Sequence, residues 1–160
     1  MDLYPLLEWI HILSATIIFG TGLGTAFHMW FAHKSGNVDA IAVAAANTVK
    51  ADFIFTLPAV IVQPATGILM IVYVGFPWDM PWLVASYVLY AVAGACWIPV
   101  VFLQMKAARL AKAAAAGNKP LPADYHKAMK VWFRLGWPAF IAVLIIFYMM
   151  IHKPGLWLYG

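Results

Sequence analysis

"EWIHILSATIIFGTGLGTAFHMWFAH", residues 8–33, decides the fold class of this chain. The stretch is too apolar for a surface helix, and it is long enough to cross a hydrocarbon layer of ~30 Å, which needs about 20 apolar residues. It also carries three histidines, a carboxylate, a serine and three threonines. The question is whether these polar groups only tie helices together or hold a ligand.

The composition of the whole chain indicates an integral membrane protein. Of its 160 residues, 65% are hydrophobic and 10% are charged, and the mean hydropathy is +0.86, well outside the range of soluble domains. The predicted spans are residues 6–31, 53–73, 82–103 and 131–151. The first apolar run is too long for a signal peptide and is expected to stay in the mature protein. We therefore predict a single all-α membrane domain over residues 1–160, an up-down four-helix transmembrane bundle.

Lysine and arginine residues gather in two of the three predicted links, which sets the orientation because positive loops stay in the cytoplasm. They are Lys34 and Lys50 in the first link, and Lys106, Arg109, Lys112, Lys119, Lys127, Lys130 and Arg134 in and around the third. This asymmetry predicts that both termini lie outside, in a multi-pass protein of the bacterial inner (cytoplasmic) membrane. The net charge of +4 follows from this topology, and we do not interpret it as nucleic-acid binding.

Two of the links are themselves helical in character. Residues 35–52, "SGNVDAIAVAAANTVKAD", are rich in alanine and offer Asn37 as an N-cap. Residues 104–117, "QMKAARLAKAAAAG", continue the third span as a basic helix that Gly117 stops. Helices 2 and 3 are therefore predicted to extend into the cytoplasm.

Aromatic residues flank the inner ends of the spans. They are Trp30, Phe31, Phe102, Trp132 and Phe133. Because amphipathic rings settle at the level of the lipid headgroups, we interpret these five as membrane anchors.

The polar residues of the first two spans fall into stripes when each residue is turned by 100° around the helix axis. One stripe contains His11, Ser14, Thr21, Thr25 and His28, and the other contains Asp52, Thr56, Gln63, Thr66, Gly67 and Met70. Such groups face the interior of a bundle or a cavity. For the hydroxyl groups and for Gln63 we favour interhelical hydrogen bonding over a role in ligand binding.

His11 is the strongest candidate for a metal ligand. It lies about one turn inside the outer boundary, where an imidazole must be paired, hydrated or bound to a metal. His28 and His33 lie near the inner interface, where water is available. His11 and His28 are also about 25 Å apart along a helix that rises 1.5 Å per residue, so they cannot bind the same ion.

The topology gives two of these histidines a companion on the same side of the membrane. His152 ends the last span on the outer side, and His126 precedes it on the inner side. Pairs of His11 with His152 and of His28 with His126 are compatible with two stacked b-type haems between the helices. Five histidines near two surfaces often fall into such pairs, so the spacing permits haem without requiring it.

The first span, together with "PAVIVQPATG" at 58–67, "GACWIPVVFLQM" at 94–105 and "GWPAF" at 136–140, resembles an uncharacterised bacterial family of four-span proteins catalogued as domain of unknown function 2269. The resemblance covers essentially the whole chain. It implies a topology and no established activity.

A more distant resemblance is to the haem-b-binding membrane protoporphyrinogen oxidases. Their first span also begins with a histidine and ends with an aromatic residue and a histidine, as His11 and His33 do here, and their last span ends in a Lys-Pro pair. That family carries a lysine and a histidine in its third span, and residues 82–103 have neither. If haem is bound, the resemblance implies five-coordinate iron on His11 or a second ligand from His152, Gln63 or Met70.

Two functions follow from these observations. The first is a membrane redox protein that binds haem b, with cofactor-binding candidates His11, His28, His152 and Gln63, and exchanges electrons with quinone or a porphyrin. The second is a non-catalytic membrane subunit or transporter-like module whose polar stripes pack helices together. Membrane lipid is the expected surrounding partner. The sequence assigns no catalytic residues, and it is compatible with a homo-oligomer.

Overall fold

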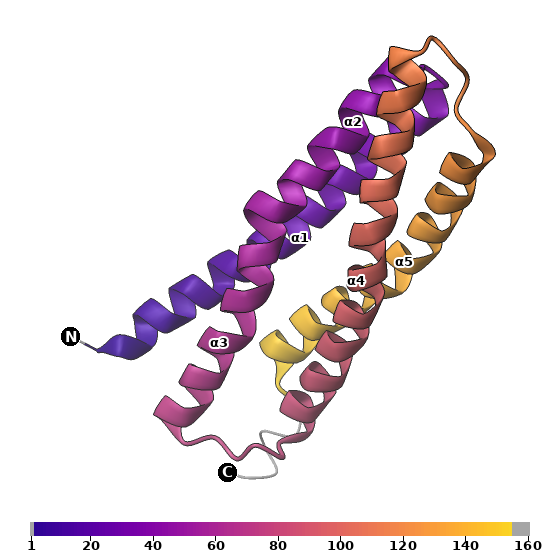
Figure 1. Cartoon of the computed structure of the whole chain (residues 1–160). Coiled ribbons are helices and arrows are strands. Elements are labelled where there is room, and N and C mark those ends of the chain that lie inside the picture. The colour runs from indigo at the N-terminus through magenta and orange to yellow at the C-terminus, as the bar shows by residue number, and fades with distance from the viewer. Residues whose placement is uncertain (1, 155–160) are drawn as a thin grey trace.

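The computed structural model describes residues 2–154 and confirms the all-α prediction, with four helices in that part of the chain long and apolar enough to cross a membrane. Figure 1 shows their arrangement. In chain order the elements are α1 (Leu3–Ser35), α2 (Val38–Ala51), a π-helical turn η1 (Asp52–Thr56), α3 (Leu57–Val74), α4 (Pro81–Ala116) and α5 (Ala123–His152). Because α2, η1 and α3 follow one another without a break, the second membrane helix runs over Val38–Val74.

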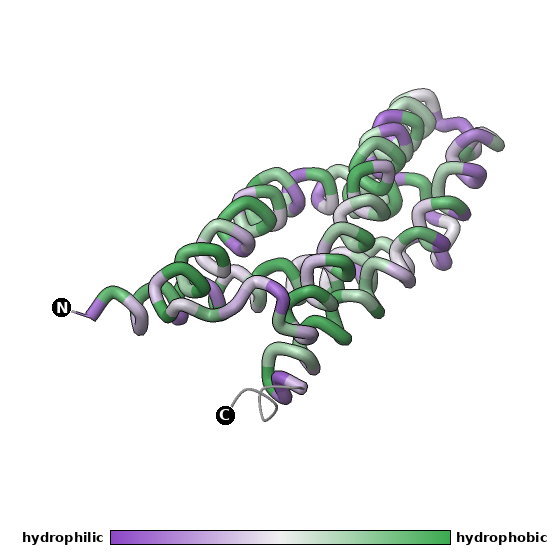
Figure 2. Tube along the Cα trace, turned by 90° about the horizontal axis from the view of Figure 1, so that it is seen from below, coloured by the Kyte–Doolittle hydropathy of each residue, from purple (hydrophilic) through white to green (hydrophobic). Residues whose placement is uncertain are grey.

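The four helices alternate in direction. The start of α1, the turn between α3 and α4, and the end of α5 lie at one end of the bundle, and the other two connections lie at the opposite end (Figure 1). Figure 2 shows hydrophobic residues along the helices and hydrophilic residues gathered toward the end where α4 connects to α5. The up-down four-helix bundle is therefore confirmed.

The predicted helical extensions of spans two and three are present. The Asn37 side chain accepts a hydrogen bond from the backbone N–H of Ala40 at 3.0 Å, so it caps α2 as expected. Helix α4 is 36 residues long and ends at Ala116, directly before Gly117. Both extensions lie at the end of the bundle that carries the lysine-rich links.

Helix α5 begins at Ala123, eight residues before the predicted span starts at 131. Half of these eight residues are charged or histidine, which is typical of a link between spans. However, Tyr125 is 0% exposed and Met129 is 2% exposed, and both pack into a core that includes Ile41. Burial of one apolar face against neighbouring helices makes this segment helical.

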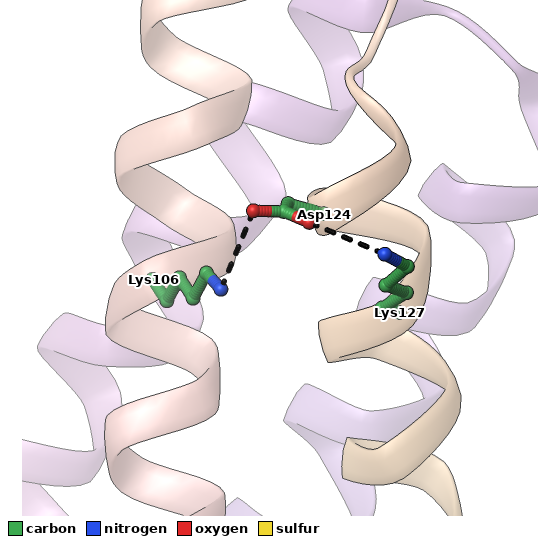
Figure 3. Close-up of polar contacts among 3 residues, drawn as sticks. All are labelled: Lys106, Asp124 and Lys127. Atoms are coloured by element: carbon green, nitrogen blue, oxygen red, sulfur yellow. Dashed lines mark ion pairs between the residues drawn. The ribbon is translucent and has the colours of Figure 1, made fainter.

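One ion pair joins α4 to the first turn of α5, and a second lies within α5 itself (Figure 3). Asp124 lies between Lys106, at 3.8 Å, and Lys127, at 3.7 Å. All three side chains are about half exposed or more, and exposed pairs of this kind contribute only about 0–1 kcal/mol. The buried Tyr125 is therefore the more important contact between this end of α5 and the bundle.

The helices do not pack equally against one another. Helix α1 packs along α3 and α2, and α4 packs along α5 and α2, whereas α1 and α5 meet only slightly. Helix α2 therefore joins the two halves of the bundle. The α1–α5 side is loosely closed, and α3 likewise packs on α1 rather than along α4.

Candidate functional site

His11 is engaged by α3 and not by another histidine. Its Nδ1 atom lies 3.0 Å from the hydroxyl oxygen of Thr66, and its Nε2 atom lies 2.9 Å from the amide nitrogen of Gln63. Ser14, one turn further along α1, donates to the amide oxygen of Gln63. The two stripes expected from the sequence therefore meet at this point, where α1 packs on α3.

The hydrogen bonds at His11 form a closed set. An amide nitrogen only donates, so Gln63 donates to His11 Nε2, and His11 carries its proton on Nδ1 and donates to Thr66. Thr66 in turn donates to the carbonyl oxygen of Val62 at 2.8 Å. Each polar atom of the cluster has a partner, which is how polar groups in a membrane are stabilised.

A glycine makes this contact with His11 possible. A Cβ atom placed on Gly67 would lie 3.2 Å from Cε1 of His11, closer than ordinary van der Waals contact. The absence of a side chain therefore lets the imidazole ring lie directly against α3, as small residues commonly do where membrane helices approach one another.

The contacts of His11 bear directly on haem binding. An axial ligand needs an imidazole nitrogen with a free lone pair. In this structure the Nε2 lone pair accepts from Gln63, and Nδ1 carries the proton that Thr66 accepts. As these residues are arranged, they do not offer an iron atom a ligand, and Gln63 would have to release Nε2 first.

The other candidate histidines have different neighbours from those expected. His152 is exposed and stacks on Tyr148 of its own helix at 4.1 Å between ring centroids. His28 is exposed on α1. His126, the predicted companion of His28, instead lies beside His33 with ring centroids 5.9 Å apart. The physical reason is that successive turns of α1 face different neighbours, and the turn with His33 is the one that meets the start of α5. Among the described residues, no group of three or more His, Cys, Asp or Glu side chains is placed to hold a metal ion.

A second polar cluster lies deeper in the bundle, around Asp52. This carboxylate is 6% exposed and accepts hydrogen bonds from Thr56 at 2.8 Å and from the amide nitrogen of Gln104 on α4. The indole N–H of Trp132 on α5 donates to the amide oxygen of Gln104 at 3.2 Å. The cluster therefore links the second membrane helix to α4 and α5.

The π-helical turn positions Asp52 for these contacts. The backbone N–H of Leu57 donates to the carbonyl oxygen of Asp52, five residues earlier, which widens the helix by one residue. Pro58, the next residue, has no N–H to give to the helix, and a proline favours such local adjustments. Single π-helical turns of this kind are often found at functional sites.

A groove of about 520 Å³ lies between α1 and α5. We call it the α1–α5 groove. Asp52, Gln104 and Val100 contribute to its wall from η1 and α4, and Gly22 on α1 and Gly136 on α5 also line it. Its volume is within the ~300–1,000 Å³ typical of small-molecule sites. The carboxylate of Asp52 is the one acidic group among the lining residues.

Aromatic side chains line much of the α1–α5 groove and mark its two ends. The aromatic lining residues are Phe19, Phe27, Trp30, Trp132, Phe133, Trp137 and Phe140. Trp30 meets Phe133 edge to face at 4.8 Å, and Phe19 stacks on Phe140 at 5.3 Å. These two contacts are 11 residues apart on α1, or about 16 Å along the helix axis. The groove between them is therefore suited to a flat or elongated apolar molecule.

Sequence reasoning placed part of this second site and missed the rest. Asp52 and Thr56 were expected on the polar stripe of span two, but no ligand role was given to them. Trp132 was interpreted as an interfacial anchor, whereas its ring is 7% exposed and its N–H is bonded inside the bundle. Gln104 was not singled out. The sequence signal that could have identified it is its place, since Gln104 is an uncharged amide at the inner end of the third span.

Comparison with known proteins identifies the family of this chain. The model of the family described as "Predicted integral membrane protein (DUF2269)" matches residues 5–154. Neither the curated proteins nor the solved structures gave a match. The match extends over all four membrane helices, from the first turns of α1 to the end of α5. The chain therefore belongs to the DUF2269 family of predicted integral membrane proteins.

Proposed function

We propose that this protein is a membrane-embedded quinone-binding protein, and that the quinone occupies the α1–α5 groove. The observation that carries the proposal is the lining of that groove, which combines aromatic walls with one buried polar pair, Asp52 and Gln104. Flat rings stack favourably on aromatic side chains. A molecule with a polar ring and an apolar tail matches such a groove.

The other ring compound expected from the sequence, a porphyrin, matches the groove less well. Free porphyrins of the haem pathway carry carboxylate groups, and these would face the carboxylate of Asp52. No lysine or arginine is among the residues that line the groove, so nothing there balances additional negative charge. A buried charge without a partner is costly. The groove therefore favours the uncharged quinone.

Filling the groove is expected to weaken quinone binding at least tenfold. Gly22→Leu and Gly136→Leu each place a large side chain into it, and a Cβ atom at either position meets no other atom within 4 Å. Leucine is also a better helix former than glycine, so the fold is expected to persist. The affinity for decylubiquinone can be measured by quenching of tryptophan fluorescence, with the protein in lipid nanodiscs. It should fall at least tenfold in both variants.

Gly20→Leu is the matched control for this experiment, because Gly20 is on the same helix, has equal space around it and does not line the groove. Its quinone affinity should equal that of the unchanged protein. Equal binding by all three leucine variants, or quenching by protoporphyrin IX with none by the quinone, would contradict the proposal.

Haem b bound through His11 remains a prediction from the sequence, and the contacts of His11 define what it requires. Protein purified in mild detergent from haem-replete cells would show a Soret band that changes with dithionite. His11→Ala would remove the band and His33→Ala would leave it. A colourless preparation would exclude this redox function. Electron transfer to a bound quinone depends on such a centre, whereas quinone binding does not.

The alternative, a non-catalytic membrane subunit, rests on the hydrogen bonds around His11. The bonds of His11 and Ser14 to Gln63 and Thr66 are satisfied as helix packing alone. A protein with this function and no ligand would bind neither quinone nor haem, and Gly22→Leu would leave its properties unchanged. The groove experiment therefore separates the two functions.

A further inference from the structure

The orientation of the Gln104 amide is fixed by its neighbours. An indole N–H can only donate, so the atom of Gln104 that Trp132 approaches at 3.2 Å must be the oxygen. The nitrogen therefore faces Asp52 and donates to its Oδ2 atom. An amide nitrogen carries two N–H groups, and this bond uses one of them.

Asp52 has capacity to accept further hydrogen bonds. A carboxylate can accept about four, and the structure gives it one from Thr56 and one from Gln104. Among the described residues, the ion pairs within 4.0 Å involve Asp124 with Lys106 and Lys127, so no cation is paired with Asp52. The groove wall at this point therefore presents an acceptor beside an amide donor.

We infer that the α1–α5 groove selects the reduced form of its ligand, a quinol, through a hydrogen bond from a ring hydroxyl to the carboxylate of Asp52. This inference rests on the proposed quinone-binding function and names the form that binds. A hydroxyl can donate to Asp52 and accept from the second N–H of Gln104. A quinone carbonyl can only accept, so it faces the oxygen lone pairs of Asp52 without a proton between them.

The two forms differ at their contact with Asp52, whose two oxygens both accept hydrogen bonds in this structure. Hydrogen bonds to carboxylates are shorter and roughly twice as strong as those between neutral groups. The aromatic walls contact both forms alike, so they add affinity without discriminating. We expect the protein to bind the quinol at least tenfold more tightly than the quinone. For a two-electron couple this raises the midpoint potential of the bound ligand by about 30 mV.

Asp52→Asn is the variant that tests this inference. Because Trp132 fixes the nitrogen of Gln104 toward position 52, the new amide must turn its oxygen to Gln104. Its nitrogen then faces Thr56 and the groove, and presents an N–H donor where the carboxylate accepted. The variant should prefer the quinone over the quinol, which reverses the order of affinities. A loss of fold would weaken the binding of both quinone and quinol and would not reverse the order of their affinities.

The experiment compares decylubiquinol with decylubiquinone by anaerobic calorimetric titration of the whole protein in detergent. Asp39→Asn, an exposed carboxylate in the first turn of α2, is the matched control and should keep the preference for the quinol. Equal affinity for both forms, or a quinol preference that survives in Asp52→Asn, overturns the inference while quinone binding stands. If neither form binds and Gly22→Leu has no effect, the proposed function itself is wrong.

Discussion

Replacing Gln104 with leucine is expected to lower the free energy of unfolding by about 2–6 kcal/mol. The change removes the donor to Asp52 and the acceptor for Trp132 at once. Each buried polar group left without a partner costs about 1–3 kcal/mol, and a charged one costs more. Asp52 is 6% exposed and Gln104 is 4% exposed, so water does not readily replace the lost bonds.

Unfolding in mixed micelles with increasing dodecyl sulfate, followed by circular dichroism, measures this loss. The double variant Asp52→Leu, Gln104→Leu is the informative companion. Replacing both partners of a buried bond by apolar groups can be nearly neutral, so the double variant should be more stable than Gln104→Leu alone. A stability of Gln104→Leu equal to that of the unchanged protein would show that the cluster is open to water.

Tyr125→Ala is expected to lower the free energy of unfolding by about 3–5 kcal/mol, the usual cost of truncating a fully buried aromatic side chain. Tyr125 is 0% exposed and lies in the core shared by α1, α2, α4 and α5. Its hydroxyl group lies 3.1 Å from Nδ1 of His33, so this ring also connects α1 to α5. The same micelle titration measures the effect.

Two matched variants separate the contributions at this end of the bundle. Tyr125→Phe keeps the ring and loses only the bond to His33, which is worth about 1 kcal/mol. Asp124→Asn removes the neighbouring exposed ion pairs and should cost about 0–1 kcal/mol. If Tyr125→Phe were as destabilising as Tyr125→Ala, the hydrogen bond rather than the packing of the ring would hold α5 in place.

The sequence predicted the parts of this fold that depend on local composition. Long apolar runs specify membrane helices, and the cap at Asn37 and the stop at Gly117 follow from side-chain and backbone chemistry within a few residues. It also placed His11 and Gln63 on polar stripes. The spacing permitted a pairing of His11 with His152, whereas Gln63 and Thr66 are the partners of His11 in the structure. A stripe shows which face is polar, but not which helix that face meets.

The groove and its polar end depend on contacts between helices distant in the sequence. Gln104 lies next to Asp52 only because α4 packs along α2, and Trp132 reaches Gln104 only because α5 packs along α4. The start of α5 was missed for a related reason, since its apolar face is narrow and becomes evident only against the core that covers it. The angular position of Asp52 depends further on a helical turn that no periodicity of 3.6 residues describes.

The number of residues in that turn sets the angle between the side chains before and after it. The five residues from Asp52 to Thr56 occupy a turn that four would fill in an ordinary helix, and each residue of an α-helix turns the chain by about 100°. Asp52, which contacts Gln104, is the first residue of this turn, and Gln63, which contacts His11, follows the turn on α3. Deletion of one residue from this turn would rotate Gln63 by about 100° relative to Asp52, and the two contacts would then not form together.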